Sequence, residues 1–184
     1  MDGGAESYKR YLEGDDEGFV EIVKEYKDGL ILYLAGYSGS VLTAEELAED
    51  TFVKLGLKRP RFLGRSSFKT WLYTIGRNTA LDYLRKRAKL DAVPLDEIAE
   101  LEAETTIERE YLETERRIAV YKAINELKPE YRQILWLIYF EEFRYKDAAA
   151  IMKKSVHAAE MLASRARAEL KTILEKVGYN YEDR

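Results

Sequence analysis

The segment from Pro60 to Lys89 constrains this chain more than any other, because it joins a basic loop to a long amphipathic stretch. It reads PRFLGRSSFKTWLYTIGRNTALDYLRKRAK. Between Val53 and Leu90 the chain carries 11 Lys or Arg residues and one acid, Asp82, whereas the whole 184-residue chain has a net charge of −4. An acidic protein that gathers positive charge and aromatic rings in one segment offers a surface to an anionic ligand with flat faces. Single-stranded nucleic acid is the first candidate.

The spacing of apolar residues in this segment sets the fold class. Ser66 or Ser67 can cap a helix that we expect to run to about Lys89. Its apolar face consists of Phe68, Trp71, Leu72, Ile75, Thr79, Leu81 and Leu84. Only three prolines and an abundance of Leu, Ala, Glu and Lys extend this expectation to the whole chain. The sequence therefore predicts an all-α fold.

Two further helices are expected before this one. Asp15 can cap the first, which should end between Gly36 and Gly39. Thr43 and Glu46 form a capping box, in which the acid three residues on reaches back to the amide of the cap, and this predicts the start of the second. Three helices with short breaks between them can close one helical bundle over residues 15–89.

Composition divides the chain into two small helical domains. Residues 1–14 are short, polar and contain glycine, so we expect a flexible N-terminus, with a contact by Tyr8, Tyr11 and Leu12 as the alternative. Residues 90–106 begin a stretch from Asp91 to Arg117 that holds 10 acids and 3 bases, which predicts an acidic linker. The second domain is expected over 107–178, followed by a tail at 179–184.

The second domain contains a helix-turn-helix pattern. A helix is expected over 108–126, and Pro129 at the first turn starts another that should reach Glu141. Its run Ile134–Phe140 is apolar nearly all round, which predicts a buried helix. A short Ala-rich helix over 145–152, a turn at 153–154 and a last helix capped by Ser155 complete the pattern.

Several classes of protein have little support. The chain has no Cys, and its apolar runs are far shorter than the roughly 18 residues that span a bilayer. The N-terminus does not resemble a signal peptide, so we expect a cytoplasmic protein without membrane insertion. With one His, no phosphate-binding glycine loop and no Ser-His-Asp constellation, we expect no enzyme, catalytic residue, small-molecule substrate, cofactor or metal.

Four stretches, in this order, resemble a bacterial sigma-70 transcription initiation factor of the compact extracytoplasmic-function (ECF) type. They are Thr43–Phe52, Phe62–Arg85, Leu127–Glu141 and Tyr145–Leu170. The second fits the pattern FxGxSSFxTWLxxIxRNxxxDxxR, which core packing alone does not require. The resemblance implies a subunit that binds core RNA polymerase and directs recognition of the −10 and −35 promoter elements and DNA melting. The polymerase performs the chemistry in this family, and an anti-sigma factor is a further candidate partner.

The resemblance assigns the first domain to promoter melting and −10 reading, in which a loop captures an unpaired base and cations contact phosphates. The predicted residues are Arg61, Phe62, Arg65, Ser66, Ser67, Phe68, Lys69, Trp71, Arg77, Asn78, Arg85, Lys86 and Arg87. Packing in the bundle is favoured over DNA contact for Trp71, and the two alternatives are even for Phe62. For Asp82 an ion pair within the helix is favoured.

The last helix departs most from the family. Family members commonly have Lys or Arg, then Ser, then Arg where this chain has Glu160, Met161 and Leu162, and often Gly where it has Lys153. Residues 153–176 still carry a net charge of +3. The residues predicted to bind −35 DNA are Tyr145, Lys153, Lys154, Ser155, His157, Ala158, Glu160, Met161, Ser164, Arg165 and Arg167. Met161 and Leu162 could instead face an anti-sigma partner or the core.

The acidic helix is the predicted polymerase-binding element, with residues Glu45, Glu46, Leu47, Glu49, Asp50 and Phe52. The family usually has Gln at position 49. A solvated helix face is the simplest alternative, and a carboxylate metal site would need a His or a second acidic helix nearby, whereas the only His is His157.

The sequence is also compatible with a second function. The altered residues of the last helix fit a helix-turn-helix DNA-binding regulator, or a helical interaction module, that lacks initiation activity.

Overall fold

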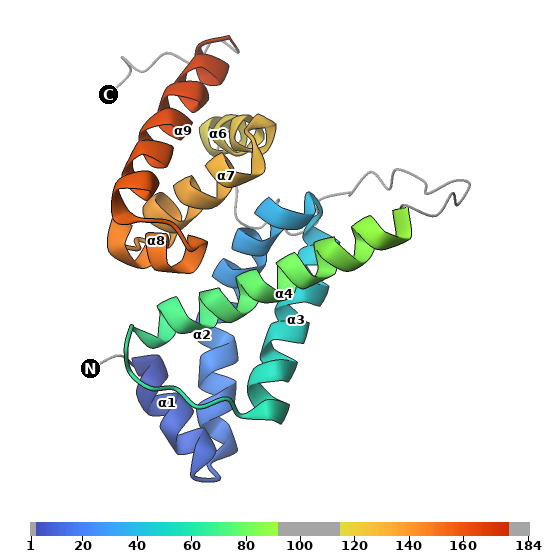
Figure 1. Cartoon of the computed structure of the whole chain (residues 1–184), viewed down its shortest axis with the longest axis vertical. Coiled ribbons are helices and arrows are strands. Elements are labelled where there is room, and N and C mark those ends of the chain that lie inside the picture. The colour runs from blue at the N-terminus through green and yellow to red at the C-terminus, as the bar shows by residue number, and fades with distance from the viewer. Residues whose placement is uncertain (1–2, 92–114, 177–184) are drawn as a thin grey trace. The chain divides into compact units, whose positions relative to one another are not determined.

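The computed structural model describes residues 3–91 and 115–176, and the regular secondary structure in these ranges is helical throughout (Figure 1). The chain folds into two compact units, so the predicted all-α fold with two helical domains is confirmed. The first unit contains α1 (Gly3–Leu12), α2 (Asp16–Ser38), α3 (Val41–Lys58) and α4 (Phe68–Asp91). The second contains α6 (Glu115–Glu126), α7 (Pro129–Leu135), the π-helix η1 (Trp136–Phe140), α8 (Tyr145–Met152) and α9 (Val156–Lys176). The predicted linker from residue 92, the start of the second domain and the tail lie outside the described residues.

The expectation of a flexible N-terminus is wrong for residues 3–12, which form α1. One face of α1 is buried at helical spacing and consists of Gly4, Ser7, Tyr8 and Tyr11. Tyr8 is only 1% exposed and Tyr11 7%. The two large rings supply the apolar surface that a count of aliphatic residues in this segment does not reveal.

Two predicted helix starts are confirmed. The Asp15 carboxylate accepts a hydrogen bond from the Glu17 amide at 3.1 Å, and α2 ends at Gly39, whose φ of 72° is left-handed. At the start of α4, the Ser67 hydroxyl accepts a hydrogen bond from the Thr70 amide at 3.1 Å. Ser67 is therefore the cap of α4.

The predicted cap of α3 is wrong. Ser40 occupies the cap position, and its hydroxyl accepts a hydrogen bond from the Thr43 amide at 3.4 Å. Thr43 lies in the first turn, three residues later. The sequence does not separate the two because Ser40 and Thr43 both carry a hydroxyl that suits the start of a helix.

The core of the first unit lies where α4 crosses α2 and α3. Its largest fully buried side chains include Leu30, Leu34, Leu55, Phe68, Leu72 and Tyr73. Gly76 of α4 faces α2, and a Cβ atom there would lie 2.8 Å from Leu30 Cδ1. The absence of a side chain at Gly76 therefore lets α4 pack closely on Leu30. This crossing holds α4 with its charged residues on the outside of the bundle.

The apolar run of the second unit is buried over only part of its length. Pro129 occupies the first turn of α7 as predicted, and residues 133–137 are buried. Beyond this the helix widens into η1, where the Glu141 amide donates to the Trp136 carbonyl five residues earlier. The wider turn changes which residues face inward, and it leaves Tyr139 50% exposed and Phe140 49%. The Phe140 ring stacks on Trp136 with centroids 4.2 Å apart.

The turn between α8 and α9 contains a non-glycine residue in a left-handed conformation. Lys153 has a φ of 54°, and Glu142, in the loop after η1, has a φ of 56°. This conformation costs a residue with a Cβ atom about 1–2 kcal/mol. Lys153 is exposed, so no buried contact compensates at this position.

Lys153→Gly should therefore raise the free energy of unfolding of the second unit by about 0.5–1 kcal/mol, after the entropy of glycine in the unfolded chain is subtracted. The change can be measured by urea unfolding in a Trp71→Phe background, in which Trp136 is the remaining tryptophan. Ala168→Gly, at an exposed site inside α9, is the matched control and should lower stability by about 1 kcal/mol. A loss of stability in both variants would contradict the strain at Lys153.

Candidate nucleic-acid and polymerase interfaces

The basic loop between α3 and α4 is held by aromatic packing at its centre and presents charge around it. It passes α1 on its way to the start of α4 (Figure 1). Phe62 is half-buried, and its ring centroid lies 5.1 Å from that of Trp71 and 5.7 Å from that of Phe68. Arg61 and Arg65, on either side, are exposed. The loop therefore combines an anchored ring with free cations, as a surface for an unpaired base requires.

The burial of the aromatic residues separates packing from DNA contact. Phe68 is fully buried, so the prediction that its side chain contacts DNA is wrong in this structure. Trp71 is half-buried among Tyr8, Phe62 and Phe68, which agrees with the packing role favoured for it. Some of its surface stays accessible beside the loop.

The exposed side of α4 carries most of the remaining predicted residues. Asn78, Arg85, Lys86 and Arg87 are exposed, whereas Lys69 and Arg77 are half-buried. The Arg85 guanidinium donates to the Asp82 carboxylate at 2.7 Å, so the predicted ion pair within the helix is confirmed. Because this pair is exposed, it adds little stability and orients Arg85 instead. Ser66 is half-buried. The hydroxyl of Ser67 caps α4 and is therefore already hydrogen-bonded within the protein.

On α3 the predicted polymerase-binding residues divide into two sets. Leu47 and Phe52 are 3% and 7% exposed and pack in the bundle, so little of either side chain is open to a partner, although Phe52 also forms part of a groove wall. Glu45 is half-buried. Apart from Lys58 at the end of the helix, the exposed residues of α3 follow one stripe, which we call the α3 stripe. It consists of Leu42, Glu46, Glu49, Asp50, Val53 and Leu57.

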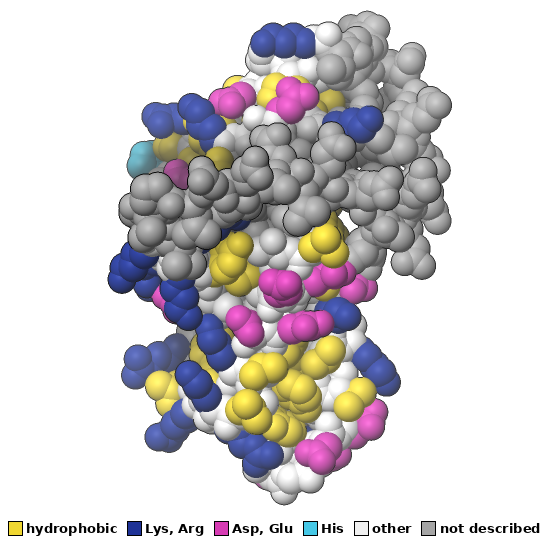
Figure 2. All heavy atoms as spheres, turned by 90° about the vertical axis from the view of Figure 1, so that its right-hand side faces the viewer, with side chains coloured by type: hydrophobic (Ala, Val, Ile, Leu, Met, Phe, Trp, Pro, Cys, Tyr) yellow, Lys and Arg dark blue, Asp and Glu magenta, His cyan; other side chains and the backbone are white. Residues whose placement is uncertain are grey.

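The apolar members of the α3 stripe were not predicted from the sequence. Leu42 is 61% exposed, Val53 52% and Leu57 82%. Steps of three and four residues from Glu46 and Glu49 reach all of them, so helical spacing could have found them. Figure 2 shows hydrophobic side chains gathered on the face of the first unit that carries α3, with acidic side chains beside them.

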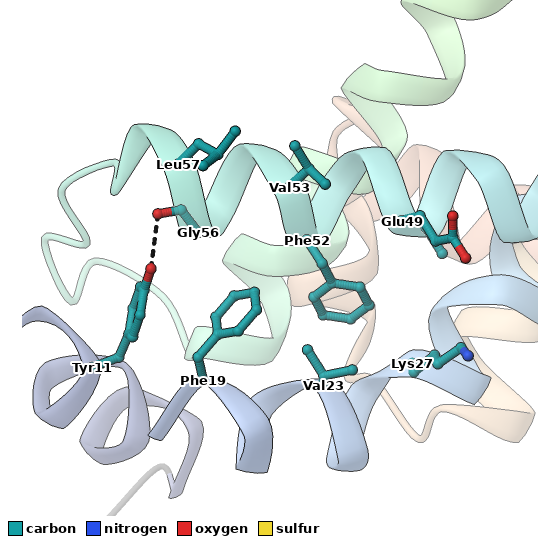
Figure 3. Close-up of a pocket in the computed structure, with 10 residues that line it drawn as sticks. Tyr11, Phe19, Val23, Lys27, Glu49, Phe52, Val53, Gly56 and Leu57 are labelled. Carbon is teal, nitrogen blue, oxygen red and sulfur yellow. Dashed lines mark hydrogen bonds between the residues drawn. The ribbon is translucent and has the colours of Figure 1, made fainter. Parts of the chain in front are cut away.

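A groove of about 620 Å³ runs beside this stripe, between α3 and the pair α1 and α2. Its walls are mainly apolar and include Phe19, Val23, Phe52, Val53 and Leu57. Lys27 and Glu49 lie at one end, and Tyr11 and Gly56 at the other (Figure 3). Among the residues that the structure describes, no cluster of three or more His, Cys, Asp or Glu side chains is placed to hold a metal ion.

In the second unit, α8 and α9 form the predicted pair of helices joined by a tight turn. The Ser155 hydroxyl accepts a hydrogen bond from the Ala158 amide at 3.1 Å and caps α9. The buried side of α9 is lined by alanines, which allow close packing. Its exposed side contains the predicted residues His157, Ala158, Glu160, Met161, Ser164, Arg165 and Arg167. Leu162 is half-buried.

The turn residues that were predicted to bind DNA differ in their surroundings. Lys153 is exposed, whereas Lys154 forms an ion pair with Glu130 at 3.1 Å. Tyr145, at the start of α8, is half-buried. Only part of the predicted positive charge of this turn is therefore available without breaking a contact.

Comparison with known proteins identifies both units. A model of Sigma-70 region 2 matches residues 22–90, and a model of Sigma-70, region 4 matches residues 117–170. Together they span more than half of the chain. The chain belongs to the sigma-70 family. The predicted family is thus confirmed, and with it the prediction that the chain is a sigma factor of the ECF type.

Two related sigma factors align with this sigma factor over most of its length. RNA polymerase sigma factor YlaC of Bacillus subtilis is 30% identical, and the alignment covers 85% of this chain and 91% of the relative. ECF RNA polymerase sigma factor SigM of the same organism is 28% identical, with 88% and 98% covered.

Solved structures show the same fold. The sigma factor RpoE of Bartonella quintana, in complex with the anti-sigma factor NepR, is 29% identical with a TM-score of 0.67, and 90% of this chain and 98% of that one are covered. CnrH, in complex with the cytosolic domain of CnrY, is 22% identical with a TM-score of 0.63 and supports the fold alone. None of the helices in the described parts of this sigma factor is long and apolar enough to cross a membrane.

Proposed function

We propose that this sigma factor binds core RNA polymerase in the cytoplasm and directs it to promoters, where its first unit opens the −10 element and its second unit binds the −35 element. The family membership and the exposed cations around the anchored Phe62 support this function. The polymerase performs the chemistry, and the sigma factor supplies binding surfaces alone.

The proposed melting surface consists of the loop and the outer side of α4. Phe62 and the accessible part of Trp71 offer faces for an unpaired base, and Arg61 and Arg65 lie on either side. Arg77, Arg85, Lys86 and Arg87 follow the phosphates along α4, with Lys69 near its start. Phe68 is not part of this surface because it is buried, and its ring packs against that of Phe62.

The proposed polymerase surface is the α3 stripe. Its acids match a basic or polar partner, and its apolar ends can be buried against one. Leu47 and Phe52 hold the helix in the bundle and are left out of the contact surface. An anti-sigma factor is a further proposed partner, because a solved relative of this fold is bound to one.

Transcription from a reconstituted complex tests the function. Purified chain mixed with bacterial core RNA polymerase should initiate run-off transcription on genomic DNA fragments, and sequencing the transcripts would give the promoters. The chain should bind core polymerase first and bind promoter duplex poorly by itself. A chain that did not associate with core polymerase would contradict the proposal.

Exposed Glu160 and Met161 favour a second candidate, a helix-turn-helix regulator or interaction module without initiation activity. A carboxylate on the outer face of α9 is repelled by DNA phosphates, and Met161 is 43% exposed. Binding to core polymerase without a melted promoter bubble would identify this second function.

Glu160→Gln should strengthen binding of the chain to promoter duplex about threefold at moderate salt, because one repulsive charge is removed from the proposed DNA-facing helix. Fluorescence anisotropy with labelled duplex would measure it. Glu126→Gln, at an exposed position on α6 of the same unit, is the matched control and should have no effect. Equal changes in both variants would indicate a general charge effect and would count against α9 as the DNA-facing helix.

A further inference from the structure

Helix α1 precedes the span that matches Sigma-70 region 2, and the proposed function gives it no role. It is fixed firmly on α2. The Ser7 hydroxyl donates to the Glu21 carboxylate at 2.7 Å, and Arg10 donates to the same carboxylate at 2.9 Å. These bonds lower the pKa of Glu21, which favours its charged form. A helix anchored in this way can hold a neighbouring segment in place.

The neighbouring segment is the end of α3, where the chain leaves the helix for the loop. The Tyr11 hydroxyl donates to the Gly56 carbonyl at 2.9 Å (Figure 3). Gly56 is in the last turn of α3, whose carbonyls have no partner within the helix. Arg59, which ends α3 with a left-handed φ of 42°, places its guanidinium 4.7 Å from the centre of the Tyr11 ring. Tyr11 therefore fixes the helix end.

Tyr8 extends this support into the loop. Its hydroxyl donates to the Pro60 carbonyl at 2.7 Å, across 52 residues of chain. Burial raises the pKa of Tyr8 to about 12, which favours the protonated hydroxyl. Its ring centroid lies 5.5 Å from that of Phe68 and 5.4 Å from that of Trp71. Phe62 packs on these same two rings, so Tyr8 contacts both the start of the loop and the rings beneath its centre.

We propose that Tyr8 and Tyr11 of α1 are positioning residues for the loop of residues 60–67, which they hold at its junction with α3 so that Phe62 and the flanking arginines meet the unpaired −10 base. This inference rests on the proposed function of that loop. The loop has no regular secondary structure of its own, and Gly64 inside it adopts a left-handed φ of 67°. Its shape therefore depends on contacts from outside, and a base-reading site loses selectivity when its supporting contacts loosen.

The test uses Tyr8→Phe in the full chain, assembled with core polymerase, because this variant keeps the ring and removes only the hydroxyl. The probes are two single-stranded oligonucleotides, one with the −10 sequence found by transcript sequencing and one with its most selective base replaced. We expect the ratio of the two affinities to fall about fivefold, as the loss of one hydrogen bond predicts. The affinity for core polymerase should stay unchanged. Tyr11→Phe should lower the ratio in the same direction.

Two further variants separate the possible failures. Ser7→Ala breaks a bond between α1 and α2 without touching the loop, and its ratio should stay within about twofold of wild type. Arg61→Ala tests the loop itself, and an unchanged affinity and ratio in that variant would overturn the proposed function of the loop. If Arg61→Ala weakened binding but Tyr8→Phe kept the wild-type ratio, the positioning role would be overturned alone. Equal weakening on both oligonucleotides in Tyr8→Phe would also overturn it, since a general structural loss changes both affinities alike.

Discussion

Holoenzyme that carries Arg61→Ala, Arg65→Ala and Lys86→Ala together should bind its promoter about a hundredfold more weakly than wild type near physiological salt. All three side chains are exposed on the proposed melting surface. Each cation that neutralises a phosphate releases counterions, and three lost contacts should reduce the slope of log affinity against log salt by about two to three. The affinity difference should therefore shrink as the salt concentration rises.

A matched triple variant keeps this prediction specific. Lys9→Ala, Lys24→Ala and Lys122→Ala removes the same charge from exposed positions on α1, α2 and α6. Its promoter affinity should change far less, and its salt slope should stay near that of wild type. Filter binding over a range of salt concentrations measures both quantities. If the two triple variants had the same slope, the surface around the loop and α4 would not be the path of the phosphates.

The parts of the fold that the sequence revealed are those that local chemistry determines. Asp15 and Ser67 bond to amides two or three residues away, so their roles as caps are visible in a short window. Helix α1 was missed because the hydroxyls of its buried tyrosines have their partners at the end of α3 and in the loop, at Gly56 and Pro60. No local pattern shows that a tyrosine will find a carbonyl 45 or 52 residues further along the chain.

In the candidate sites, the sequence predicts which charged residues are exposed but not which apolar residues are buried. Charged residues such as Arg61 and Glu49 were placed at the surface from the sequence, since an unpaired charge is rarely buried. Aromatic and aliphatic residues could not be placed in this way, because the same apolar side chain can pack in a core or contact a partner. Phe68 was predicted to contact DNA and is buried, whereas Leu57 was not predicted to lie on a binding surface and is 82% exposed. Phe68 packs against the rings of Tyr8 and Tyr26, which lie far from it in the sequence.

Val53→Asp and Leu57→Asp together should weaken binding of the chain to core RNA polymerase by about thirtyfold or more, as expected when apolar contact residues become carboxylates that an interface must desolvate. Both side chains are largely exposed in this structure, so the free chain should lose at most about 0.5 kcal/mol per substitution. The effect should therefore appear in binding and leave the melting temperature nearly unchanged. Titration of labelled chain with core polymerase, beside a thermal unfolding curve, measures the two.

Two other variants decide what a positive result means. Val20→Asp adds a carboxylate at a site 39% exposed on α2, away from the α3 stripe, and should leave polymerase binding unchanged. Phe52→Ala empties a buried site and should cost about 3–4 kcal/mol of stability. Since Phe52 has almost no exposed surface, Phe52→Ala should weaken polymerase binding only as far as the substitution unfolds the first unit. Stabilising conditions should then restore binding. The stripe variant should not be restored in this way, because its defect lies in the contact itself. If the stripe variant bound core polymerase as tightly as Val20→Asp, α3 would present a merely solvated face, and the polymerase would have to bind elsewhere on this sigma factor.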